Sequence, residues 1–317
     1  MLISASRRTD IPACYPEWFL NRMREGYVLV PNPRNLRQLS RISLRGEDAE
    51  GIVFWTKNPM PLLPYLDELC GFGIPFGFQF TITPYGRDIE PNLPDKRELL
   101  EAFRVLSQKL GPEKVVWRYD PVILSEDWTT KRHLEAFSEM AKWLEGYTGR
   151  CVFSLIDWYR KLSPAGSALA ARSWSEEEVR AVAEELSDIA RSHGMVLSAC
   201  CEEAALTRWG VVREACISEG FAAAVIGAPV HGKKDPGQRA ECGCIQSADV
   251  GVYDSCLNGC LYCYANTSRQ AILRNAANHH KDSPTLIGYP DPEAAVVPRK
   301  LPSIKTAQMK FPFKNKE

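Results

Sequence analysis

The sequence lacks the features that would place it in several common classes of protein. Its 39 lysines and arginines are balanced by 39 aspartates and glutamates, so it carries no long-range positive field of the kind typical of dedicated nucleic-acid-binding proteins. No apolar run is long enough to cross a bilayer, and the N-terminal apolar run is too short for a signal peptide. We therefore expect a cytoplasmic protein with no membrane partner, and nucleic acid is disfavoured as a partner.

The two common phosphate-binding loops are also missing. The chain contains no GxxxxGK followed by serine or threonine, and the glycine cluster at 71–77 lacks the GxGxxG spacing and precedes a strand. Both a P-loop fold and a Rossmann dinucleotide fold are therefore disfavoured.

What the sequence does contain is a repeated unit of a short apolar run, polar residues and a helical pattern. We expect strands at 2–6, 27–30, 51–55, 76–83, 114–119, 151–156 and 195–200, and amphipathic helices at 16–25, 99–110, 134–144 and 175–193. After residue 208 the pattern weakens, and it predicts a helix at 211–219, a short strand at 221–226 and a last one at 248–253.

Strand-then-helix alternation of this kind predicts a parallel α/β sheet, and the number of units favours a (β/α) barrel, full or partial, with a TIM-like or permuted strand order. The barrel is expected over 1–230, and a cysteine-rich iron–sulfur segment that closes its mouth is expected over 231–268. A Pro/Lys-rich extension over 269–317 is expected to wrap the body or to be partly disordered.

The chain has 11 cysteines, an odd number that includes an adjacent pair, and it is too large to need disulfide staples. In a reducing compartment such a surplus indicates metal or redox use. Cys14, Cys70 and Cys151 are isolated in the sequence, and we expect them to be small buried apolar residues.

The densest motif is a CxxxCxxC loop formed by Cys256, Cys260 and Cys263, with Tyr262 just before the last thiol. Thiolates are the usual ligands of iron–sulfur clusters, and three ligands on a four-iron cube leave one iron open to an exogenous molecule. Structural zinc, completed by Cys242 or Cys244, is the alternative, although zinc sites more often use CxxC pairs.

This loop resembles the signature loop of the radical S-adenosylmethionine (radical SAM) enzymes. The resemblance implies a 4Fe-4S cluster on Cys256, Cys260 and Cys263, SAM chelated to the open iron, and reductive cleavage of SAM to a 5′-deoxyadenosyl radical that abstracts hydrogen from a substrate. In that superfamily the loop follows the first strand of the barrel, whereas here it follows all the strands, and the glycine-rich GGE-type stretch that commonly binds the SAM amino group is absent. The loop would regain its customary place if the last strand returned beside the first.

A closer resemblance is to an uncharacterised bacterial and archaeal family, a domain of unknown function with a radical-SAM-like cysteine cluster at its C-terminal end. Nearly the whole chain except the tail is similar to that family. The stretches that carry the likeness are 7–12 (RRTDIP), 54–59 (FWTKNP), 117–121 (WRYDP), 238–239 (QR) and 249–266.

A second metal site is expected from the remaining cysteines. We expect it to consist of Cys201, Cys216, Cys242 and Cys244, holding an auxiliary 4Fe-4S cluster or zinc. Cys200 is expected to face the other side of its strand, because successive side chains alternate. The alternative is that these residues are buried free thiols.

Charged residues at the strand ends are the candidates for binding SAM or substrate. Arg7, Arg8, Lys57 and Arg118 could anchor the SAM carboxylate or an anionic substrate, and Tyr262 is expected to pack beside the SAM adenine or the cluster. Asp10, Asp120, Asp157 and Glu202 could bind ribose hydroxyls or a substrate cation. The alternative for each is an ion pair that only holds barrel loops together.

The leading hypothesis is therefore a radical SAM enzyme that acts on a small-molecule or side-chain substrate and takes electrons from an external donor such as a flavodoxin or ferredoxin. One alternative is an iron–sulfur electron-transfer or sensor protein without SAM chemistry. The other is a zinc-stabilised nucleic-acid-binding protein that uses the basic tail and exposed aromatic residues.

Overall fold

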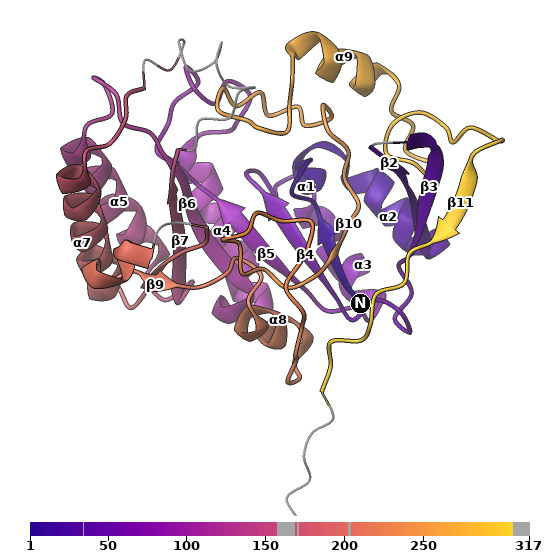
Figure 1. The fold of residues 1–317 in the computed structure, drawn as a ribbon, viewed down its shortest axis with the longest axis horizontal. Coiled ribbons are helices and arrows are strands. Elements are labelled where there is room, and N and C mark those ends of the chain that lie inside the picture. Colours follow the sequence, from indigo (N-terminus) through magenta and orange to yellow (C-terminus); the bar gives the residue numbers. More distant parts are fainter. Residues whose placement is uncertain (34, 157–168, 170, 202–203, 307–317) are drawn as a thin grey trace, which may run out of the picture.

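The computed structural model describes residues 1–33, 35–156, 169, 171–201 and 204–306 (Figure 1). In these residues the main sheet is built from eight strands in the order β10 (Ala248–Asp249), β1 (Leu2–Ala5), β4 (Gly51–Thr56), β5 (Phe76–Thr81), β6 (Val115–Val122), β7 (Arg150–Leu155), β8 (Val196–Ala199) and β9 (Val212–Arg213). Every neighbouring pair is parallel. The predicted α/β class with a parallel sheet is confirmed.

The sheet is open rather than closed. In the described part of the chain β10 and β9 stand at its two edges, and each is only two residues long. Closure into a barrel needs long edge strands that pair with each other, and a complete TIM-like barrel is therefore not formed here. The part of the prediction that is confirmed is the parallel α/β sheet.

The last strand of the main sheet, β10, returns beside the first strand, β1. The resemblance to radical SAM enzymes implies this position for the strand before the cysteine loop. β10 pairs with β1 in parallel, with Ile3 opposite Ala248 and Ser4 opposite Asp249. β10 stands at one edge of the sheet, and from β1 to β9 the strands follow one another in chain order. The carboxyl ends of parallel strands meet at one edge of the sheet, so the loops after β1 and β10 are neighbours.

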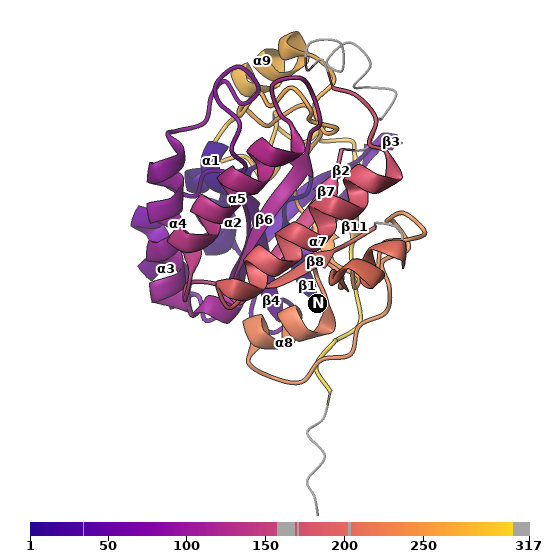
Figure 2. The same cartoon turned by 90° about the vertical axis from the view of Figure 1, so that its left-hand side faces the viewer.

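One face of the sheet is apolar and covered by helices. Buried aromatic side chains such as Phe54, Phe78, Trp117 and Phe153 point to this face. Helices α4, α5 and α7 lie side by side over it (Figure 2). The helices are α1 (Ile11–Cys14), α2 (Pro16–Glu25), α3 (Leu66–Gly71), α4 (Lys96–Leu110), α5 (Thr130–Leu144), α7 (Glu176–Ser192), α8 (Glu219–Ile226) and α9 (Arg269–Ala277), with 3₁₀ turns η1 (Leu63–Tyr65), η2 (Pro112–Lys114) and η4 (Ala204–Trp209).

The opposite face changes character along the strands. Near their amino ends, Val53, Val116 and Val152 pack with Phe221 and Val225 of α8 in a separate apolar cluster. Because side chains alternate, the residues two positions further on share this face. Those residues are Trp55, Arg118 and Ser154, so the same face becomes polar towards the carboxyl ends of the strands.

Two predicted elements after residue 210 are wrong. The stretch predicted as a strand at 221–226 belongs to helix α8, and the stretch predicted as a helix at 211–219 contains strand β9. Ser218 caps α8, its hydroxyl accepting a hydrogen bond from the Phe221 N–H at 3.1 Å, and Gly227 ends the helix at φ 72°. This cap and the alanines of 222–224 are helix signals that outweigh the apolar run.

The C-terminal extension wraps the body as far as it is described. β11 (Ala295–Pro298) pairs with β3 (Asn35–Ser43), which forms an antiparallel hairpin with β2 (Tyr27–Asn32). The Glu50 carboxylate joins this extension to the N-terminus, accepting from the Ile304 N–H at 3.0 Å and lying 2.9 Å from the Met1 ammonium group. None of the described helices combines the length and the apolar character needed to cross a membrane.

Candidate functional site

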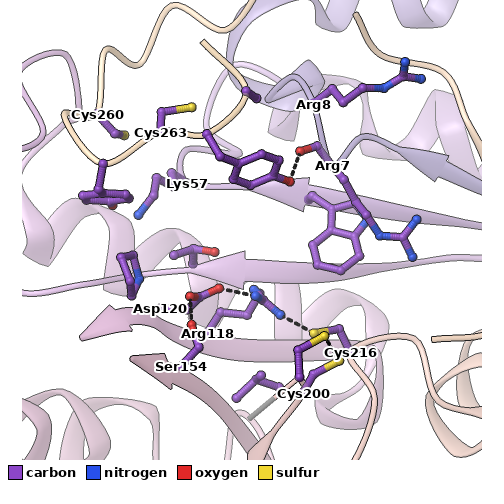
Figure 3. A pocket seen from close by; sticks show the side chains of 18 of the residues that line it. Arg7, Arg8, Lys57, Arg118, Asp120, Ser154, Cys200, Cys216, Cys260 and Cys263 are labelled. Atoms are coloured by element: carbon purple, nitrogen blue, oxygen red, sulfur yellow. Dashed lines mark hydrogen bonds and ion pairs between the residues drawn. The ribbon is translucent and has the colours of Figure 1, made fainter. Parts of the chain in front are cut away.

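A cavity of about 470 Å³ lies at the carboxyl ends of the strands, the usual place for a ligand in a parallel α/β sheet. Figure 3 shows Cys260 and Cys263 on one side of it, Cys200 and Cys216 on the other, and Arg118 and Asp120 between them. The predicted site residues that line it are Arg7, Arg8, Asp10, Lys57, Arg118, Asp120, Cys201, Cys216, Cys242, Cys244, Cys256, Cys260, Tyr262 and Cys263. The other two candidates, Asp157 and Glu202, lie outside the described residues.

Backbone hydrogen bonds hold the CxxxCxxC loop against the segments that follow β1 and β5. The Tyr15 hydroxyl donates to the Ser255 carbonyl at 2.6 Å, and the Leu261 N–H donates to the Ile89 carbonyl at 3.0 Å. Gly259 adopts φ 71°, a left-handed conformation in which a side chain is disfavoured. The three thiols are therefore left to face the cavity.

The three thiols of the loop are not gathered as tightly as those of the second cysteine group. Of the described residues, the one group of three or more metal-ligand side chains whose ligand atoms all lie within 4.8 Å of one another is Cys200, Cys242 and Cys244. Cys256, Cys260 and Cys263 line the same cavity without forming such a group.

A further cysteine, Cys14 at the end of α1, lies beside Cys256. The Cys14 thiol lowers the pKa of Cys256, and Cys256 raises the pKa of Cys14. Burial raises the pKa of Cys263 to about 11. Cys14 does not line the cavity, so the three thiols of the loop remain the ones that face it.

The buried carboxylate of Glu90 holds two lysines beside this loop. Glu90 is fully buried and accepts from Lys57 Nζ at 2.8 Å, from the Thr83 hydroxyl at 2.7 Å, and from Lys96 and the Tyr262 hydroxyl. Burial alone would raise the pKa of Glu90, but Lys57 and Lys96 lower it to about 2. Glu90 therefore holds the Lys57 ammonium group close enough to Cys260 for each group to influence the pKa of the other.

Asp10 connects three parts of the site. Its carboxylate accepts from the Lys57 N–H at 2.7 Å, the Asn258 side-chain amide at 2.8 Å and the Ala13 N–H at 3.1 Å. Burial raises its pKa despite these bonds. Asp10 thus ties the loop after β1 to the end of β4 and to the cysteine loop.

Asp249, which the sequence reasoning missed, joins β10 to the loop after β1. Its carboxylate accepts from the Ser6 hydroxyl at 2.7 Å, from the Arg7 N–H at 2.9 Å and from Arg8 Nε at 3.0 Å. Burial would raise its pKa, and the Arg8 guanidinium and these hydrogen bonds lower it overall. A lone acidic residue in the apolar run 248–252 is the sequence signal that could have identified it.

The middle of the cavity carries a charged pair. Arg118 Nη1 donates to the Cys216 sulfur at 2.8 Å, and Nη2 bonds to Asp120, which also accepts from the Ser154 hydroxyl (Figure 3). The guanidinium carbons of Arg7 and Arg118 each lie 5.1 Å from the centre of the Trp55 ring. Burial would lower the pKa of Arg118, but Cys216 and Asp120 raise it, so Arg118 keeps its charge in the cavity wall.

The second cysteine group differs from the prediction in one member. Cys200, predicted to face away, lies 3.9 Å from Cys242 and 3.8 Å from Cys201, sulfur to sulfur. The alternation along β8 holds, but the face that Cys200 shares with Ser198 is the one turned to the cavity. Cys201 follows in a turn at φ 68°. The triad of Cys200, Cys242 and Cys244 could hold a metal ion.

The remaining thiols of this group are adjacent to the triad. Cys216 interacts with both Cys200 and Cys244. Cys200 alone would raise the pKa of Cys244, but Cys216 and Cys242 lower it to about 6. Of the isolated cysteines, Cys151 is buried as predicted, whereas Cys70 is exposed on α3, which contradicts the prediction.

A family model described as "Domain of unknown function (DUF1848)" matches residues 2–265. No curated protein matches the chain. The matched range contains both cysteine groups and every described residue of the cavity wall, and it ends before α9.

Proposed function

The chain belongs to the DUF1848 family, and from the three loop thiols that line the cavity we propose that it is a radical SAM-type enzyme. Cys256, Cys260 and Cys263 would hold a 4Fe-4S cluster whose open iron faces the cavity, and SAM and the substrate would bind inside it. When bound, the cluster would supply the electron that splits SAM, so that the adenosyl fragment can take a hydrogen atom from the substrate.

One observation carries this proposal: three thiols face one cavity from a loop that follows the strand next to β1. In spatial order from β10, the loop follows the first strand of the parallel sheet, which is the place that the resemblance to radical SAM enzymes implies. The position of Cys14 outside the cavity suits a cluster with one free corner.

The side chains of the cavity have roles that follow from their contacts. Arg7 Nη2 is buried and has no hydrogen-bond partner in the structure, so it is a donor suited to the SAM carboxylate or to an anionic substrate. Asp120, fixed by Arg118 and Ser154, presents a carboxylate to the substrate space. The surrounding walls would exclude water from the reaction.

Reconstitution tests the proposal. The protein, reconstituted anaerobically with iron and sulfide, then reduced and mixed with SAM, should form 5′-deoxyadenosine detectable by chromatography. Cys260→Ala should abolish this product, and Cys70→Ala, which changes an exposed thiol remote from the cavity, should not. Product that persists in Cys260→Ala would show that the loop is not the site.

An electron-transfer or sensor protein is the second candidate, and the position of Cys14 beside Cys256 is what favours it. If Cys14 were the fourth ligand, the cluster would have no free iron and SAM would leave its EPR spectrum unchanged. Zinc at the loop, together with salt-sensitive binding of DNA or RNA, would instead favour the zinc-stabilised nucleic-acid-binding alternative.

A further inference from the structure

We propose that the second cysteine group binds a single zinc ion through Cys200, Cys216, Cys242 and Cys244, as a closed site in the wall of the cavity, and not a second iron–sulfur cluster. This site depends on the proposed radical chemistry in no respect, since it uses different thiols from a different part of the chain.

The distances between the sulfurs carry the assignment. Zinc–thiolate bonds of about 2.3 Å in a tetrahedron place the sulfurs about 3.8 Å apart. The sulfurs of Cys200 and Cys242 are 3.9 Å apart, and those of Cys200, Cys242 and Cys244 all lie within 4.8 Å of one another. In a four-iron cube each thiolate binds a separate iron, which keeps the ligand sulfurs further apart.

Two further thiols, Cys201 and Cys216, adjoin the triad, and neither lies within 4.8 Å of all three of its sulfurs. Cys216 is the better fourth ligand of the two, because it interacts with both Cys200 and Cys244. It is buried, whereas Cys201 is only half-buried. The Cys216 carbonyl accepts from the Gln79 amide at 2.8 Å, which fixes its backbone, and its sulfur accepts from Arg118. Hydrogen bonds of this kind orient metal ligands and stabilise their charged form.

The charge around the group also suits a tetrathiolate. Four thiolates and one zinc ion carry two negative charges, which require compensation when buried. Arg118 donates directly to the Cys216 sulfur, Arg7 lies close enough to Cys244 for their charges to interact, and the Ile217 N–H donates to the Cys244 sulfur at 3.4 Å.

A zinc ion in this place would shape the substrate cavity. Arg118 bonds to the metal ligand Cys216 with one nitrogen and to Asp120 with the other. The ion would therefore fix the position of Asp120 through Arg118, although it would not touch the substrate. Arg118 is in this sense a positioning residue.

Metal analysis tests the assignment. The full chain, purified and freed of loosely bound metal, should contain one zinc per chain, and the metal-free protein titrated with Co²⁺ should develop the strong visible bands of a tetrahedral cobalt–thiolate. Cys200→Ser should lose the zinc and the cobalt spectrum but still bind iron and sulfide at the loop after reconstitution. Cys260→Ser should lose the loop iron and keep the zinc, and Cys70→Ser should keep both.

Several results would overturn the proposal. Iron and sulfide that remain at cluster stoichiometry in Cys260→Ser would show that the second group holds a cluster. Zinc that remains in Cys200→Ser would place the ion elsewhere. A tetrathiolate cobalt spectrum that is lost in Cys201→Ser but kept in Cys216→Ser would overturn the choice of Cys216. An unchanged circular dichroism spectrum shows that each variant is folded, and the variants of Cys200, Cys201 and Cys216 should in addition still bind iron at the loop.

Discussion

At the scale of single residues, Cys14 decides whether a cluster on the loop is open or closed. Its thiol adjoins Cys256 yet stays out of the cavity. We expect Cys14→Ser to bind as much iron and sulfide as the wild type, and we expect SAM to change the EPR spectrum of the reduced cluster equally in both proteins. Loss of iron in Cys14→Ser, with a wild-type spectrum insensitive to SAM, would instead identify Cys14 as the fourth ligand.

Glu90 gives a prediction for the dependence of stability on pH. Its pKa is about 2 in the folded protein against an ordinary 4.5, so between these values the unfolded chain binds more protons than the folded one. Its contribution to stability is therefore complete above about pH 5 and is lost as the pH falls towards 2. The loss amounts to about 3 kcal/mol, at 1.36 kcal/mol per pKa unit.

Denaturant unfolding of the metal-free protein across this pH range measures the effect. Wild type should exceed Glu90→Gln in free energy of unfolding by a margin that shrinks by about 3 kcal/mol from pH 6 to pH 2. Glu98→Gln, an exposed change on α4, should follow the wild type. A margin that is independent of pH would show that Glu90 is not held as a carboxylate by the two lysines.

At the scale of elements, β10 depends on one side chain. A strand of two residues has too few ladder hydrogen bonds to hold a loop in place, and Asp249 adds bonds to Ser6, Arg7 and Arg8. Asp249→Ala should speed amide hydrogen exchange across 248–265 and leave α4 and α5 unchanged, because Arg8 loses its buried partner. Iron binding after reconstitution should fall with it.

The exposed Asp188→Ala on α7 is the matched control and should leave exchange in 248–265 unchanged. Exchange that is equally slow in Asp249→Ala and wild type would mean that the backbone pairing with β1 alone keeps the loop in position.

The sequence predicts the helices, strands and metal ligands that depend on local patterns. It does not predict side-chain positions that depend on contacts between residues distant in sequence. Helix α2 has the predicted bounds because a proline begins it and Gly26 ends it. The CxxxCxxC loop is equally local. The position of Cys200 could not be predicted, because it depends on which face of β8 is turned to the cavity. Asp249 is likewise explained only by partners at the other end of the chain.

At the scale of the whole molecule, alternation predicts a parallel sheet but leaves its closure open. Closure depends on the edges, and here both edge strands are two residues long. The segment that carries α8, Cys216, Cys242 and Cys244 packs against the face that a barrel would enclose. The two cysteine groups are thereby brought to one cavity.

For the molecule as a whole we propose that a cluster on the loop after β10 would offer SAM a free iron inside this cavity. Electron–nuclear double resonance on the reduced, reconstituted protein tests it, with SAM that carries a magnetic oxygen isotope in its carboxylate. We expect a hyperfine coupling between that oxygen and the cluster, present in Cys14→Ser as well as in the wild type. An intact four-iron cluster without any such coupling would contradict it.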